Sequence, residues 1–176
     1  MNFREQLIAE LSKRNTDYIA SVIGTDETLF KEIFEIILTN DPYVSGRAAW
    51  VVESCWLKYP HLIKPYINEI IDFLPNTKYD NQRRHFTKYL STIDLRELDE
   101  DRIGILIDKC FNWLEDPKYP TAVKMYSMLI VYNYVLIEPI LAKELIAVIE
   151  NQFEDSTPGF KNSASKILKK LYKFID

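Results

Sequence analysis

The chain has 176 residues, of which 47% are apolar and 27% are charged, and its formal net charge is −4. These values are typical of one soluble globular domain and exclude an intrinsically disordered chain. The negative charge also argues against a general polyanion binder, because proteins that neutralise nucleic-acid phosphates normally carry a large excess of basic side chains.

The sequence lacks the features of an exported or membrane-spanning protein. Arg4 and Glu5 lie where a signal peptide needs its apolar core. No stretch approaches the ~18 unbroken apolar residues of a membrane span. Cys55 and Cys110 stand among apolar neighbours, which predicts buried, reduced thiols rather than a disulfide or a zinc site. We therefore expect a cytoplasmic protein.

In chain order, the apolar pattern predicts two short helices, at about 3–11 and 16–23, followed by four helical hairpins. In the second hairpin, for example, apolar side chains at helical spacing run from Leu62 to Leu74. The second helices of the hairpins are predicted at about 43–58, 81–93, 120–135 and 158–174. Their starts, at Asp41-Pro42, Asp80, Tyr119-Pro120 and Thr157-Pro158, recur every ~38 to 40 residues, a period typical of stacked hairpins.

These elements predict a single domain over residues 1–176. Residues 1–24 are expected to form a terminal cap, because the first hairpin would otherwise expose its apolar face. The predicted hairpins span residues 26–58, 61–93, 99–135 and 138–175.

The predicted helix starts carry suitable capping residues. Asp41 is expected to be an N-cap with Pro42 in the first helical position, where its missing N–H costs nothing. Thr157 and Pro158 repeat this arrangement. An acidic run from Glu97 to Asp101 precedes the third hairpin, where negative charge favours the start of a helix.

The segment from Asp41 to Ala49, with Pro42 beside the Asp and Arg47 six residues after it, resembles the turn and second helix of a HEAT repeat. Asp155 and Lys161 repeat this spacing. The resemblance covers about residues 26–175 and implies an all-α fold, a right-handed superhelix of the HEAT/armadillo type. In that family the Asp and the Arg commonly form a ladder between adjacent repeats.

The resemblance also implies that the second helices line a concave surface. Basic and aromatic side chains cluster near the starts of these helices and predict a groove for an acidic protein or peptide segment, because arginine and large aromatic residues are enriched in binding hot spots. The alternative is that they join one repeat to the next. The candidate residues are Tyr43, Arg47, Trp50, Arg83, Arg84, Lys124 and Lys161.

Other candidates have simpler interpretations. Trp50 and Trp56 lie six residues apart and cannot share one helix face, so one of them could be exposed. His61 and His85 lack the spacing of metal ligands and are expected at a helix end or on the surface. A lysine cluster is predicted to be the solvated side of the last helix, with an anionic partner as the alternative. It comprises Lys161, Lys166, Lys169, Lys170 and Lys173.

No catalytic, cofactor or metal motif stands out, and the sequence favours a non-enzymatic scaffold that binds an unidentified protein or peptide. The alternative is a nucleic-acid-binding protein, such as the HEAT-like DNA glycosylases that excise alkylated bases, with Trp50, Arg47 and Arg84 around the lesion. The net charge and the pI of about 5.3 argue against that role. A helical lyase of the fumarase type would need a Gly/Ser-rich signature loop and a several-fold longer chain.

Overall fold

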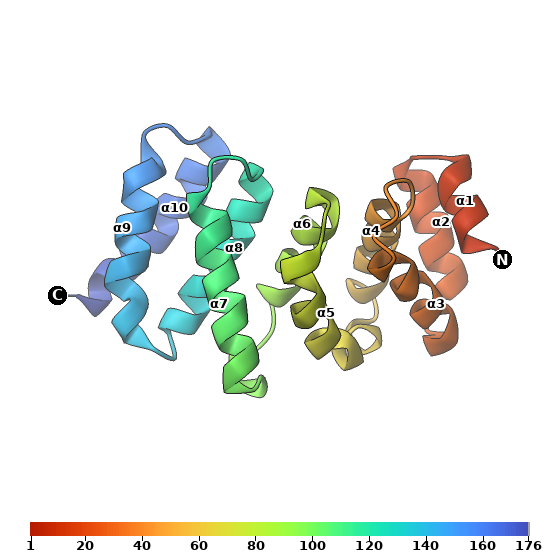
Figure 1. Cartoon of the computed structure of the whole chain (residues 1–176), viewed down its shortest axis with the longest axis horizontal. Coiled ribbons are helices and arrows are strands. Elements are labelled where there is room, and N and C mark those ends of the chain that lie inside the picture. The colour runs from red at the N-terminus through yellow and green to blue at the C-terminus, as the bar shows by residue number, and fades with distance from the viewer. Residues whose placement is uncertain (176) are drawn as a thin grey trace. The chain divides into compact units, whose positions relative to one another are not determined.

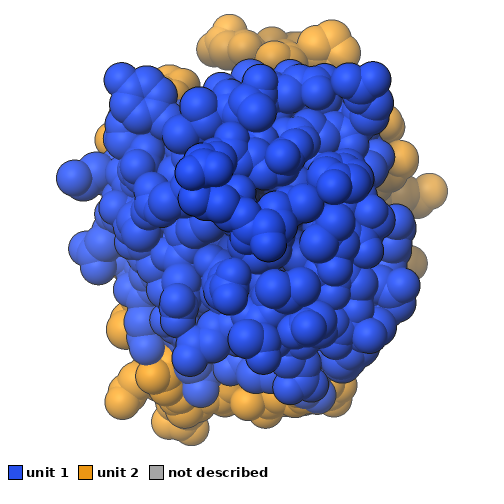
Figure 2. Space-filling view, turned by 90° about the vertical axis from the view of Figure 1, so that its right-hand side faces the viewer, with its two compact units in different colours: residues 1–86 blue, residues 87–176 orange. Residues whose placement is uncertain are grey.

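A computed structural model describes residues 1–175, and every regular element in that range is helical (Figure 1). This confirms the predicted all-α class. The chain divides into two compact units, residues 1–86 and the residues from Thr87 onward, which Figure 2 colours separately. None of the helices in the described range has the length and apolarity that a bilayer crossing requires.

The first unit contains the helices α1 to α5 and most of α6. Their bounds are α1 Phe3–Ala9, α2 Lys13–Ile23, α3 Glu27–Leu38, α4 Ser45–Trp56, α5 Ile67–Phe73 and α6 Asp80–Leu90. At the starts of the first three helices, the side chains of Asn2, Ser12 and Asp26 respectively accept a backbone N–H of the first turn. The predicted pair of short N-terminal helices is therefore confirmed.

Asp41 does not cap α4, contrary to the sequence prediction. Its carboxylate accepts the N–H of Tyr43 at 2.9 Å and so forms a local turn. Asn40 precedes that turn with a positive φ of 52°. The helix consequently begins at Ser45, and Pro42 lies in the turn. The N-cap predicted at Thr157 is correct, because Thr157 caps α10 and Pro158 is the first residue of that helix.

The first helix of the second hairpin is shorter than predicted. Between Leu62 and Leu74 the chain forms a 3-10 turn, Lys64–Tyr66, before the seven-residue α5. Pro65 explains the difference, because a proline has no N–H to donate and is tolerated only in the first turn of a helix. The apolar spacing was recognised, but a continuous helix through Pro65 was wrong.

Aromatic side chains form the centre of the first unit. The Phe34 ring lies 4.4 Å from that of Tyr66 and 6.0 Å from that of Phe86, measured between centroids. Phe34 and Phe86 are almost completely buried. These contacts join α3 to α6 and to the segment before α5, so one ring secures three parts of the unit.

The second unit begins with the end of α6 and the segment before α7, and it continues with two complete hairpins. Their helices are α7 Glu100–Glu115, α8 Thr121–Val135, α9 Ala142–Phe153 and α10 Pro158–Leu171. They pack side by side, with α8 in contact with α7, α9 and α10 (Figure 1). The hydroxyl oxygens of Thr121 and Thr157 are 3.3 Å apart, so α8 and α10 start at the same level.

We expect Phe34→Ala to lower the free energy of unfolding by about 3 to 5 kcal/mol, because it removes a buried ring and leaves a cavity. Urea unfolding followed by circular dichroism measures the change. Tyr43→Ala is the control, since Tyr43 is 73% exposed and should shift stability by less than about 0.5 kcal/mol. Equal effects of the two substitutions would contradict the aromatic centre.

Candidate functional site

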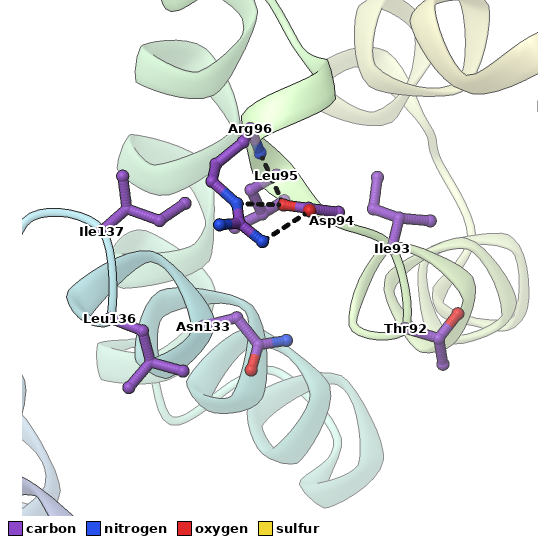
Figure 3. A pocket seen from close by; sticks show the side chains of 8 residues that line it. All are labelled: Thr92, Ile93, Asp94, Leu95, Arg96, Asn133, Leu136 and Ile137. Atoms are coloured by element: carbon purple, nitrogen blue, oxygen red, sulfur yellow. Dashed lines mark hydrogen bonds and ion pairs between the residues drawn. The ribbon is translucent and has the colours of Figure 1, made fainter.

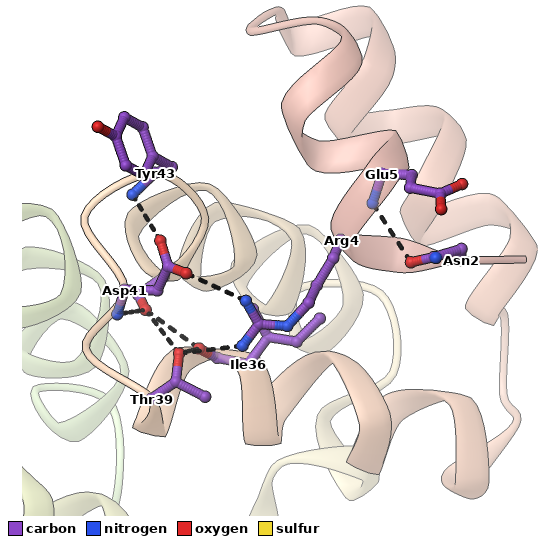
Figure 4. Close-up of polar contacts among 8 residues, drawn as sticks. Asn2, Arg4, Glu5, Ile36, Thr39, Asp41 and Tyr43 are labelled. Carbon is purple, nitrogen blue, oxygen red and sulfur yellow. Dashed lines mark hydrogen bonds and ion pairs between the residues drawn. The ribbon is translucent and has the colours of Figure 1, made fainter.

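Asp41 and Arg47, two of the residues for which the resemblance implies a ladder between repeats, contact the N-terminal helix α1. Arg4 of α1 donates to the Asp41 carboxylate at 3.1 Å and to the Thr39 hydroxyl at 3.4 Å (Figure 4). Arg47 of α4 donates to the backbone carbonyls of Leu7 and Ile8 at the end of α1. The last carbonyls of a helix have no partner within it, so Arg47 satisfies acceptors that α1 leaves open.

The aromatic candidates of the first unit differ in exposure. Tyr43 is 73% exposed in the turn before α4, whereas Trp50 is half-buried. Trp56 is 8% exposed and belongs to the core. Neither indole is therefore fully exposed, and Tyr43 is the aromatic candidate most accessible to a partner.

Arg83 holds the loop before α6 in place. Its guanidinium donates to the Thr77 carbonyl at 2.8 Å and forms an ion pair with Asp80. The side chain is only 8% exposed. A buried guanidinium with these contacts stabilises the start of α6.

Arg84, His85 and Glu53 form a polar chain that the sequence did not reveal. An Arg84 nitrogen lies 3.0 Å from Nε2 of His85, and Nδ1 of His85 lies 2.6 Å from a Glu53 carboxylate oxygen. Because a guanidinium can only donate, Nε2 accepts and Nδ1 carries the proton that bonds Glu53. His85 is 3% exposed, so the expectation of a surface or helix-terminal histidine was wrong.

Lys124 and Lys161 lie in the second unit, and each contacts residues at the C-terminal end of α9. Lys124 donates to Gln152 at 3.0 Å and lines a pocket of about 210 Å³. Burial lowers the pKa of Lys124, although Asp116 opposes this effect. The Lys161 ammonium lies 3.6 Å from Glu154 and 5.7 Å from the centre of the Phe153 ring.

One side of α8 is uncharged and partly exposed. Its opposite side is buried, including Val123, Ser127, Met128, Ile130, Val131 and Val135. Met125, Leu129, Tyr132 and Leu136 recur at helical spacing on the outward side, and the first three are half-buried. Leu136, just after the helix, is 54% exposed. The sequence pattern did not reveal this stripe, because apolar residues occur all around α8 and no single apolar side stands out.

Three lysines of the C-terminal segment run beside this stripe. Lys166, Lys170 and Lys173 are spaced by four and three residues and therefore share one side of the helical segment. The Lys170 ammonium lies 5.4 Å from the centre of the Tyr132 ring, a cation–π contact that places Lys170 next to α8. We call the apolar residues of α8 and these lysines together the α8–α10 surface. It comprises Leu129, Tyr132, Leu136, Lys166, Lys170 and Lys173.

A larger pocket of about 500 Å³ opens at the C-terminal end of α8. Residues 92–96 form one side, and Asn133, Leu136 and Ile137 form the other (Figure 3). Leu136 therefore belongs both to this pocket and to the α8–α10 surface. The Asn133 amide donates to the Ser91 carbonyl at 2.9 Å and fixes the distance between the two sides.

The cysteines offer no reactive thiolate. Both are buried with free thiols, and burial raises the pKa of Cys55 to about 12 and raises the pKa of Cys110 as well. Within residues 1–175 no group of three or more His, Cys, Asp and Glu side chains is placed to hold a metal ion.

Comparison with protein families shows what the chain resembles. A family model described as a HEAT repeat domain matches residues 3–171, which is nearly the whole chain. Comparisons with curated proteins and with solved structures return no match. The family match agrees with the resemblance that the segment around Asp41 indicated.

Arg47→Ala is expected to lower the free energy of unfolding by about 1 to 2 kcal/mol, because it removes the donor for two helix-terminal carbonyls. Arg14→Ala serves as control, since the Arg14 side chain is 87% exposed and its ion pair is weak. Chemical denaturation of both variants provides the comparison. An Arg47→Ala protein as stable as the wild type would show that Arg47 is free for another role.

The raised pKa of Cys55 predicts a loss of stability in alkaline solution. The folded chain retains the neutral thiol up to about pH 12, whereas the unfolded chain ionises near the ordinary value of 9. This contribution is therefore complete below about pH 9 and disappears as the pH rises towards 12. Unfolding free energies at several alkaline pH values should fall less steeply for Cys55→Ala than for the wild type, and equal slopes would contradict the burial effect.

Proposed function

The chain belongs to the HEAT repeat domain family, and we propose that it is a non-enzymatic scaffold whose α8–α10 surface binds a protein or peptide segment. The contact between Lys170 and Tyr132 carries the proposal, because it joins an uncharged apolar stripe to a basic one. A surface of this composition can bury apolar side chains and pair with acidic groups at the same time.

The charge on α10 favours an acidic partner. Between Pro158 and Ile175 the chain contains five lysines and no acidic residue. Lys166 and Lys173 are exposed, and within residues 1–175 neither forms an ion pair. An acidic segment would therefore meet positive charge without displacing an existing ionic partner.

The half-exposed residues of α8 favour a protein segment over a nucleic acid. Leu129 and Leu136 offer apolar contacts that phosphate groups cannot use. The residues considered for base excision also have other contacts, since Arg47 donates to α1 and Arg84 lies against His85.

A cytoplasmic location is part of the proposal and is supported by the two free, buried thiols.

The candidate residues outside the α8–α10 surface divide into two groups. Tyr43 and Trp50 remain proposed contacts of the first unit. Polar contacts within the chain already involve Arg47, Arg83 and Arg84 in the first unit and Lys124 and Lys161 in the second. We propose that these five mainly stabilise the helices of their own units.

Replacing Lys166, Lys170 and Lys173 together by Glu is expected to weaken partner binding about tenfold or more, because three attractive charges become repulsive. The measurement is affinity capture from the native cell extract with quantitative mass spectrometry. A protein captured at fixed stoichiometry by the wild type should be lost with the triple variant.

The matched control replaces Lys58, Lys78 and Lys143 by Glu, which gives the same change in net charge at three other exposed lysines. This control should retain the partner. The proposal fails if the wild type captures no stoichiometric protein, or if both triple variants capture it equally. Circular dichroism verifies that all three proteins are folded.

A further inference from the structure

We infer that the pocket at the C-terminal end of α8 receives a large apolar side chain from an acidic protein segment bound on the α8–α10 surface. This inference rests on the proposed function and specifies the chemistry of the partner. Figure 3 shows the pocket between the loop of residues 92–96 and the end of α8.

The pocket has the size and lining of an anchor site. Its volume of about 500 Å³ falls within the range of sites that enclose small ligands or side chains. Ile93, Leu95, Leu136 and Ile137 contribute apolar atoms to the lining. Leu95 is 2% exposed and belongs to the fixed core, whereas Leu136 is 54% exposed at the mouth. An entering apolar side chain would cover Leu136 and gain contact with a preformed wall.

The polar lining favours an uncharged occupant. Arg96 donates to both carboxylate oxygens of Asp94, at 2.9 and 2.8 Å. The Arg96 guanidinium holds the pKa of Asp94 below its usual range, so the pair remains ionised with no net charge. A single charged group in the pocket would lose hydration without gaining an uncompensated opposite charge. An apolar side chain does not incur that cost.

The acidic part of the segment follows from the position of the lysines. Lys170 lies over Tyr132, one helical turn before Leu136, and α8 and α10 start at the same level. Lys166 and Lys173 continue the basic stripe on either side of Lys170. A segment whose acidic side chains reach these lysines can therefore place an apolar side chain at the mouth of the pocket.

Three synthetic peptides of equal length test both features separately. The first combines glutamates with leucines at helical spacing, the second replaces the leucines by alanine, and the third replaces the glutamates by lysine. Titration calorimetry should show binding of the first, at least about tenfold weaker binding of the second, and none of the third, since a buried leucine and attractive charges each favour binding. In amide NMR spectra the first peptide should shift resonances of residues 92–96 and 133–137.

Leu136→Glu should weaken binding of the glutamate–leucine peptide about tenfold or more, because it places a negative charge at the mouth of the pocket. Leu57→Glu is the matched control. Leu57 follows α4 as Leu136 follows α8, and it is 56% exposed. The control should bind the peptide as the wild type does. Equal affinities of wild type and Leu136→Glu, or resonance shifts elsewhere, would overturn the inference.

The peptide results also separate this inference from the proposed function. If the alanine peptide binds as tightly as the leucine peptide, and both require the three lysines, the pocket has no anchoring role and the scaffold proposal stands. If no peptide binds and the lysine variant captures the cellular partner unchanged, both fail. A single-stranded DNA oligonucleotide that binds the lysines more tightly than the glutamate–leucine peptide would overturn the choice of a protein segment.

Discussion

Burial of one hairpin's apolar side chains by its neighbour is the constraint on which each unit of this structure depends. A single amphipathic helix cannot remove its apolar stripe from water, and an isolated hairpin removes only part of it. In the first unit, Phe34 of α3 therefore contacts Tyr66 and Phe86 from later segments. In the second unit, α8 packs against α7, α9 and α10. The outward side of α8 remains partly exposed, and the proposed binding surface lies there.

The helical class and most helix positions could be predicted because local rules determine them. Apolar spacing and caps such as Thr157 act within one or two turns of the chain, so a sequence pattern is sufficient. Local rules also explain the errors. Asp41 can accept an N–H in a turn as well as in a helix cap, and in the structure it accepts the N–H of Tyr43 in a turn. At Pro65 the apolar pattern favoured a continuous helix, but the missing N–H restricted α5 to the residues that follow.

The site was less predictable because its residues act through contacts between distant segments. His85 and Glu53 are 32 positions apart, and no spacing rule connects them. Basic side chains near helix starts were correctly noticed, yet their roles depend on which acceptors lie nearby. Arg47 reaches carbonyls at the end of α1, and Arg83 reaches the Thr77 carbonyl. An arginine near backbone carbonyls that lack a hydrogen-bond donor donates to these carbonyls rather than to a partner, because a buried acceptor without a donor costs free energy.

A chain with a net charge of −4 can nevertheless present a basic surface, because binding responds to local charge. At physiological salt the screening length is about 8 Å, so a segment on α10 interacts mainly with the charges within that distance. Glu154 of α9 lies against Lys161, and Glu150 accepts a hydrogen bond from Tyr172. Tyr172 lies two positions after Lys170, which places these residues on different sides of the helical segment. Glu150 and Glu154 therefore contact one side of the α10 segment. The lysines on the opposite side, including Lys170 beside Tyr132, remain available to a partner.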